Sequence, residues 1–238
     1  MGPSMKGRLR QRVDWWFDMN DITDVAMHRH TAKAYDPNKK ISPELMEKVR
    51  KLVRFSPSSL NIQPWHIILT ESPEGKARVS KATENVHIFN KKAIDGASHV
   101  LVFCAWNDAD EDYLSKILAQ EEADGRVPRE GEVREKLHEG RTRSINRHRH
   151  DLNDYRSYAD KQVYLNVGQL ALGVAALGLD ATIIGGFDAA VLDDEFGLAA
   201  KGLHSVLIVS LGYHDAEADH NAARPKSRLT YEEIFTEI

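Results

Sequence analysis

The chain has 238 residues, 42% of them hydrophobic and 29% charged, which is ordinary for a globular protein with a substantial core. Its formal net charge of −4 gives no reason to expect a nucleic acid or an anionic membrane as a partner. The single cysteine, Cys104, excludes an intrachain disulfide, and no segment resembles a membrane span or a secretory signal, so we expect a cytoplasmic protein with a buried structural thiol.

Residues 1–20 form a first segment that is basic at its start and aromatic at its end. A cloning remnant, an upstream start and a short interfacial helix are all compatible with it. We interpret it as a dispensable extension, followed by one domain over residues 21–238.

The next segments are helices with clear start signals. Asp21 is the N-cap of a helix that ends near His30, and Ser42-Pro43 opens a second helix with apolar residues at helical spacing. This helix ends in a loop, residues 55–66, in which two prolines, three serines and an asparagine cannot continue a helix. A loop so rich in small donors and acceptors can hydrogen-bond a flat polar ligand, although the spacing alone slightly favours a plain helix-to-strand connection.

Strands and helices alternate in the middle of the chain. We expect strands at 66–70 and 100–105, the second continuous in apolar residues and therefore buried, and a helix from Ser72-Pro73 to about Thr83. An acidic helix over 108–124 stops at Gly125. The charged stretch 130–151 is interpreted as a solvated helix, because arginines interleave with its histidines and argue against a metal site.

The last third contains the longest apolar helix, over 155–177, with small residues that let another helix approach. Gly178 ends it. A short strand over 181–184, a turn at Gly185-Gly186, a helix over 188–196 and a buried strand over 205–211 follow. The two glycines permit positive φ and a close approach of backbone to a ring. The tail shows little pattern beyond a last helical turn.

This order of elements predicts an α+β fold, with a central mixed or antiparallel sheet of four or five strands and helices on both faces. The sequence contains no glycine-rich dinucleotide motif, no Walker loop, no nucleophile elbow and no metal-binding motif, so no metal is expected. Catalysis by side-chain acids, bases or nucleophiles is not indicated either. A tightly held organic cofactor would explain scattered polar and basic residues.

Several motifs in order carry a family resemblance. Ser-Pro-Ser-Ser-x-Asn-x-Gln-Pro-Trp at 56–65 is one, and the others are RHTAKA at 29–34, QEEADGR at 120–126, KQVYLNVG at 161–168, GVAALGLDA at 173–181 and PKSRL at 225–229. The chain resembles the FMN-dependent nitroreductase family, above all its oxygen-insensitive NAD(P)H nitroreductases, also called dihydropteridine reductases, of enteric bacteria. The resemblance implies a nitroreductase-like fold for residues 21–238 and an intertwined homodimer.

The resemblance also implies the site. One subunit would bind FMN through Arg29, His30, Thr31, Lys33, Asn90, Gln162, Ile184, Gly185, Gly186, Lys226 and Arg228, and the other through Pro57, Ser58, Ser59 and Asn61. Arg29, Lys226 and Arg228 would face the phosphate, Lys33 the N1 edge, and a backbone N–H at Gly185 the reactive N5. Leu60, His87, Phe89 and Ser144 would line the substrate channel.

This sequence departs from the family pattern at several of these places. Relatives carry a second flavin-edge lysine where Ala93 stands here, with Lys92 one place early, and a glutamate where Gly185 stands. Leu60 replaces a threonine, and Arg143-Ser144 replaces a phenylalanine pair. These departures concern the choice of acceptor more than the binding of FMN.

The expected activity is an FMN-dependent oxidoreductase that uses NADH or NADPH. It would reduce nitroaromatics, quinones or related electrophiles by two-electron hydride transfer in a ping-pong cycle. The alternatives are an NAD(P)H:flavin or dihydropteridine reductase on the same scaffold, and a flavin-binding module without turnover.

Overall fold

The computed structural model describes residues 21–238, so the extension predicted over 1–20 lies outside the described residues. Four strands form one sheet in the order β1-β2-β4-β3, and each neighbouring pair is antiparallel. Their bounds are β1 Trp65–Thr70, β2 His99–Trp106, β3 Asp180–Ile184 and β4 Leu203–Gly212. The predicted α+β sheet is confirmed. Beyond the strands, Thr31 forms an isolated parallel bridge with Ala181 at the β3 edge.

Local capping signals fixed the helix starts, as the sequence predicts. The Ser42 hydroxyl accepts from the amide of Leu45 at 3.3 Å, and Ser72 caps its own helix through the amide of Gly75 at 3.0 Å. The helices are α1 Ile22–His28, α2 Pro43–Arg54, α3 Pro73–Ser80, α4 Lys91–Asp95, α5 Glu111–Ala123, α6 Glu132–Asn146, α7 Tyr155–Ala176, α8 Ala189–Phe196 and α9 Tyr231–Ile234.

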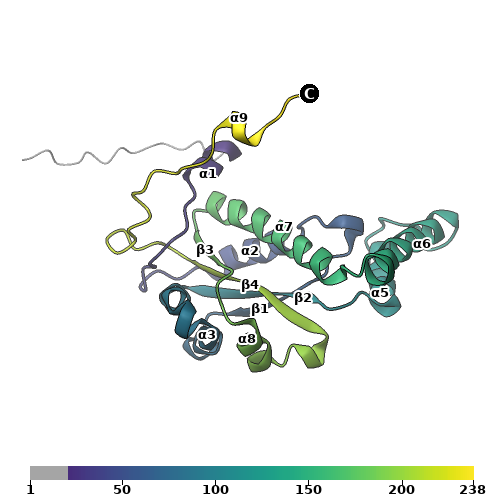
Figure 1. Cartoon of the computed structure of the whole chain (residues 1–238), viewed down its shortest axis with the longest axis horizontal. Coiled ribbons are helices and arrows are strands. Elements are labelled where there is room, and N and C mark those ends of the chain that lie inside the picture. Colours follow the sequence, from purple (N-terminus) through teal and green to yellow (C-terminus); the bar gives the residue numbers. More distant parts are fainter. Residues whose placement is uncertain (1–20) are drawn as a thin grey trace, which may run out of the picture.

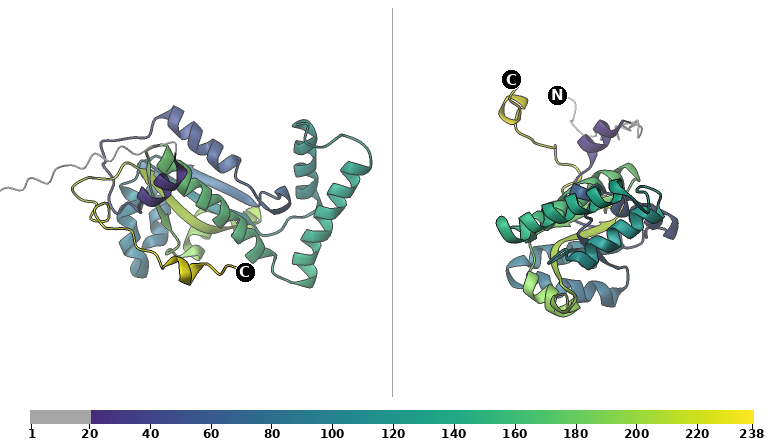
Figure 2. Two further views of the ribbon diagram at one scale, coloured as in Figure 1. Left: turned by 90° about the horizontal axis from the view of Figure 1, so that it is seen from above. Right: turned by 90° about the vertical axis from the view of Figure 1, so that its right-hand side faces the viewer.

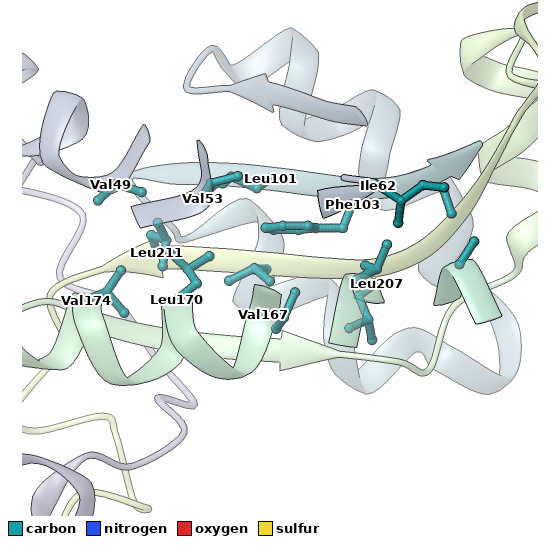
Figure 3. Packing of buried hydrophobic residues seen from close by; sticks show 14 of the residues in the cluster. Val49, Val53, Ile62, Leu101, Phe103, Val167, Leu170, Val174, Leu207 and Leu211 are labelled. Carbon is teal, nitrogen blue, oxygen red and sulfur yellow. The ribbon is translucent and has the colours of Figure 1, made fainter. Parts of the chain in front are cut away.

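Helices cover both faces of the sheet, with α2 and α7 on one side and α3 and α8 on the other (Figure 1). Strand β2 is buried on both faces because its side chains alternate between the two cores: Leu101 and Phe103 face α2 and α7, whereas Val102 and Cys104 face the opposite layer. Figure 3 shows Phe103 between residues of α2, α7 and β4. Burial raises the pKa of Cys104 to about 12, so the prediction of a structural thiol is confirmed.

The long helix α7 uses its small residues in two different ways. A Cβ at Gly173 would lie 2.6 Å from Leu52 Cδ1, so this glycine lets α2 pack closely. A Cβ at Gly168 would meet nothing within 4 Å, and Tyr164 and Leu165 nearby are 56% and 48% exposed. One stretch of α7 therefore presents an uncovered apolar face. Among residues 21–238, no helix is both long and apolar enough to cross a bilayer.

Helices α5 and α6 form a pair at one end of the molecule (Figure 2). Helices α1 and α9 project from the rest of the molecule. The prediction of a solvated helix over 130–151 is wrong in one respect. Arg141 of α6 is only 3% exposed, because it forms an ion pair with the buried Glu121 of α5. The helix then loosens into a π-helical turn, Arg147–Asp151.

Candidate functional site

The loop before β1 holds three non-glycine residues in the left-handed region. Leu60, Asn61 and Gln63 have φ of 56°, 53° and 45°. Such backbone is costly for residues with a side chain and persists only where the surroundings fix it. The sequence identifies this loop as special, but the strain itself appears only in the structure.

Polar contacts from distant elements hold the loop. Arg141 donates its Nε to the Leu60 carbonyl at 3.0 Å and an Nη to Glu121 at 2.6 Å, while Asn61 donates its amide to Glu121 at 2.8 Å. The Tyr113 hydroxyl donates to the Gln63 carbonyl at 2.6 Å. A buried ion pair between α5 and α6 thus fixes the loop. The side-chain amide of Asn61 is already hydrogen-bonded within the chain, to Glu121.

Gln162 of α7 also holds the loop, because its Oε1 accepts from the Ser59 amide at 2.9 Å. The family resemblance places Gln162 with Arg29. Within one chain Gln162 contacts the loop, whereas Ala171, which lines a hollow with Arg29, lies nine residues further along α7, about 14 Å at the helical rise. The side of the FMN site that Gln162 serves stays a prediction.

A basic cleft of about 510 Å³ lies between the end of α1 and the C-terminal segment. Arg29, Lys226 and Arg228 line it, as the sequence predicts, and Arg224 adds a fourth cation. Lys226 donates its Nζ to the carbonyls of Ala26 and Arg29, at 2.6 Å each, and so caps the C-terminus of α1. Desolvation, with Arg29 and Arg228 nearby, lowers the pKa of Lys226. Gathered cations of this kind are typical of an anion site.

The segment from His30 to Lys33 is pinned by the C-terminal tail. Asp219, whose side chain is fully buried, accepts from His30 Nε2 at 2.9 Å and from the Lys33 amide at 3.0 Å. Asn221 donates its side-chain amide to the Thr31 carbonyl at 2.8 Å. The Lys33 side chain itself is exposed. The tail that showed little sequence pattern therefore positions the predicted cofactor residues.

The turn after β3 brings Ile184, Gly185 and Gly186 to Asn90, which donates its side-chain amide to the Gly186 carbonyl at 2.7 Å. Neither glycine adopts the positive φ that its lack of a side chain permits. Gly186 is needed for space, since a Cβ there would lie 3.1 Å from Asn90 Nδ2 and 3.3 Å from His87 Nδ1. A Cβ at Gly185 would meet only Leu207, at 3.7 Å, which agrees with a side chain in relatives.

Lys92 and Ala93 lie on different sides of α4. Ala93 is buried at 5% exposure, and Lys92 is exposed about 100° further round the helix. Lys92 lines a separate hollow with Tyr35, Lys91 and Asp95.

The loop and the basic cleft lie at opposite edges of the sheet. Trp65 at the start of β1 pairs with Ala105 of β2, which in turn pairs with His204 of β4. Ile184 at the end of β3 pairs with Ile208, four residues further along β4. Trp65 and Ile184 are therefore three strand spacings apart across the sheet and four residues apart along the strands, which together correspond to about 20 Å. The proposed acceptor residues divide likewise: Leu60 and Ser144 lie with the loop and α6, and His87 and Phe89 with Gly186.

Sequence reasoning missed the residues that hold both groups in place. Asp219, Glu121 and Arg141 are buried charges whose partners are far away in the chain, so no local spacing marks them. Asp180 and His214, which accompany His30, were missed for the same reason. Among residues 21–238, these three are the ligand-type side chains grouped closely enough to hold a metal ion.

Comparison with known proteins gives one family. The model of the nitroreductase family matches residues 26–213. An oxygen-insensitive NAD(P)H nitroreductase of Enterobacter cloacae is 49% identical over 91% of this chain and 99% of its own length. A major NAD(P)H-flavin oxidoreductase of Aliivibrio fischeri is 31% identical over 88% of this chain and 94% of its own length.

Solved structures agree in fold. A protein of Staphylococcus epidermidis superposes with a TM-score of 0.78 at 22% identity, covering 92% of this chain and 96% of that one. A protein assigned as a nitroreductase, in complex with FMN, from Exiguobacterium sibiricum gives a TM-score of 0.72 at 25% identity, covering 92% of this chain and 97% of that one.

Proposed function

The chain belongs to the nitroreductase family, and on that premise we propose that it is an FMN-dependent NAD(P)H oxidoreductase that reduces nitroaromatics, quinones or related acceptors by two electrons. The observation that carries the proposal is the basic cleft between α1 and the C-terminal segment, on a chain with the family's fold. The 49% identity with an oxygen-insensitive NAD(P)H nitroreductase supports the activity.

The residues present fit the phosphate of FMN. Arg29, Lys226 and Arg228 line one cleft, and the pKa of Lys226 is lowered by desolvation and by repulsion from the two arginines, which a bound dianion would offset. Arginine adds bidentate donors of the kind that phosphate prefers. These three side chains would hold the phosphate.

The ring would lie towards Lys33 and the turn at Gly185-Gly186. When bound, FMN supplies hydride chemistry, with electrons arriving from NADH or NADPH and leaving to the acceptor. Asn90 fixes the turn through the Gly186 carbonyl, which leaves backbone amides to face the ring edge. Lys33 would place a cation near N1, where negative charge develops on reduction.

A homodimer is part of this proposal. Within one chain the loop residues Pro57, Ser58, Ser59 and Asn61 precede β1, at the edge of the sheet opposite to β3. A partner's loop would complete each site, and the exposed Tyr164 and Leu165 on α7 offer an apolar surface for the contact. Each channel would then combine Leu60 and Ser144 of one subunit with His87 and Phe89 of the other. A cytoplasmic location remains a prediction.

The visible spectrum of the purified protein tests the proposal. We expect FMN absorbance that is bleached by NADH or NADPH under argon and restored by a nitroaromatic. In air, turnover of the nitroaromatic should form no superoxide. Colourless protein that does not take up added FMN would contradict the assignment. Bound FMN that neither nicotinamide reduces would favour a module without turnover.

A second candidate is an NAD(P)H:flavin reductase, favoured by the 31% identity with the flavin oxidoreductase of Aliivibrio fischeri. Free FMN, a quinone and a nitroaromatic, compared as acceptors at equal concentration, separate the two. A kcat/KM for free flavin above that for every nitroaromatic would favour flavin reduction. In the same assay, a higher kcat/KM for a dihydropteridine would favour pteridine reduction.

A further inference from the structure

Three ligand-type side chains meet where three backbone segments run side by side. His30 precedes Thr31, which bridges Ala181; Asp180 starts β3, and His214 follows β4. One ligand atom from each of His30, Asp180 and His214 lies within 4.8 Å of the other two. Backbone pairing holds all three in register, so the cluster is preorganised rather than a chance meeting of mobile side chains.

We propose that His30, Asp180 and His214 form a binding site for a divalent transition metal of the zinc class. Two imidazole nitrogens and one carboxylate are the ligand types that Zn²⁺ and its neighbours prefer, whereas Mg²⁺ and Ca²⁺ favour oxygen alone. Three protein ligands leave further positions for water. The side chains of His30 and Asp180 are each 20% exposed and line a hollow of about 280 Å³, so an ion can enter.

The outer contacts of His30 already match those of a metal-bound histidine. Its Nε2 lies 2.9 Å from the fully buried Asp219 carboxylate, which assigns the ring proton to Nε2. Nδ1, left with its lone pair, faces Asp180 Oδ1 at 4.0 Å. This separation is too long for a hydrogen bond, but close to the spacing of about 3.3 Å between ligand atoms of a tetrahedral zinc ion.

His214 joins from the other side. Its Nδ1 lies 2.9 Å from Asp180 Oδ2, and its ring stands edge-on to that of His30 with centroids 5.2 Å apart. An incoming metal takes the lone pair of His214 Nδ1, and the single ring proton of the neutral imidazole is then carried by Nε2, so that no net proton is released. The backbone amide of His214 still donates to Asp180 at 2.9 Å, which keeps the carboxylate oriented.

The test uses tag-free, flavin-loaded full-length protein, stripped with EDTA and titrated with zinc chloride by calorimetry. We expect one zinc per chain in the wild type. His214→Ala and Asp180→Asn should each weaken binding about ten- to hundredfold or more. His138→Ala is the matched control, because His138 pairs with Glu111 at 2.6 Å and its side chain is equally accessible at 21%, without a third ligand.

Thermal unfolding with zinc or with EDTA provides a second readout that does not depend on activity. Zinc should raise Tm in the wild type and in His138→Ala, and should raise it much less in the two site variants. Each variant serves as its own reference in EDTA, so a loss of basal stability does not obscure the result. Absence of stoichiometric binding to the wild type, or equal binding in all four proteins, would overturn the proposal.

Discussion

At the scale of single residues, charge placement decides what this protein can bind. Lys226 both caps α1 and lines the basic cleft, so one side chain links local structure to ligand binding. Arg141 and Glu121 perform a comparable double role at the loop, where a buried ion pair holds strained backbone. Both positions lead to measurable predictions.

The lowered pKa of Lys226 predicts that the protein binds FMN more weakly at alkaline pH. Its pKa in the free protein is lowered by desolvation and by Arg29 and Arg228, and a phosphate dianion requires the charged lysine. Affinity should therefore fall as pH rises through this lowered pKa. Lys226→Arg remains charged and should show a flat profile in fluorescence titrations from neutral to alkaline pH. The same decline in both proteins would contradict the role of Lys226.

Arg141→Met should destabilise the chain by about 3–5 kcal/mol, because it leaves the buried Glu121 charge without its partner. The double variant with Glu121→Gln should recover part of this loss, because no buried charge remains. Urea unfolding of the two single variants and the double variant completes the cycle. Additive losses would mean that the two residues are not coupled, and that the loop is held by other contacts.

At the scale of elements, α7 is the central connection. It packs α2 through Gly173, holds the loop through Gln162, and leaves Gly168 uncovered. One helix thus contributes to the core, to the site and to a free surface. Its buried residues Val163, Val167, Leu170 and Val174 follow one helical stripe, whereas Tyr164 and Leu165 are exposed.

Gly173→Ala should destabilise the protein by about 1–3 kcal/mol, since the added Cβ would lie 2.6 Å from Leu52 Cδ1. Gly140→Ala on α6 is the control. A Cβ there meets nothing within 4 Å, so the higher helix propensity of alanine should add up to about 1 kcal/mol. Urea unfolding measures both. Equal effects of the two substitutions would show that α2 adjusts to the added methyl group.

At the scale of the whole molecule, the site is divided between two edges of one sheet. The basic cleft and the glycine turn lie by β3, and the loop lies by β1. Each half is fixed by its own buried carboxylate, Asp219 or Glu121. A second copy of the chain is the proposed means of joining the halves.

Leu165→Glu should therefore dissociate the homodimer and release FMN together. A charge placed on a 48% exposed leucine disrupts an apolar contact, but it is harmless on a free surface. Val133→Glu on α6 is the control, at 64% exposure and away from α7. Sedimentation and flavin absorbance, measured on the same sample, report both properties. A monomeric variant that retains its FMN would contradict the shared site.

The sequence by itself determined what depends on near neighbours. Ser42-Pro43 and Ser72-Pro73 start helices because the cap and the proline act within one turn. The buried strand at 100–105, the end of α7 at Gly178 and the identity of the loop follow from equally local patterns. The family motifs indicated the basic residues of the cleft, because each motif is contiguous in the chain.

Only the tertiary structure decided which residues hold these pieces together. Asp219 meets His30 across 189 positions of sequence, and Glu121 meets Asn61 across 60. Contacts over such separations leave no periodicity, because the chain returns to them by its topology and not by helix or strand repeat. The contact of Gln162 with Ser59 could not be predicted for this reason, and the cluster of His30, Asp180 and His214 exists only because β3, β4 and the segment after α1 run side by side.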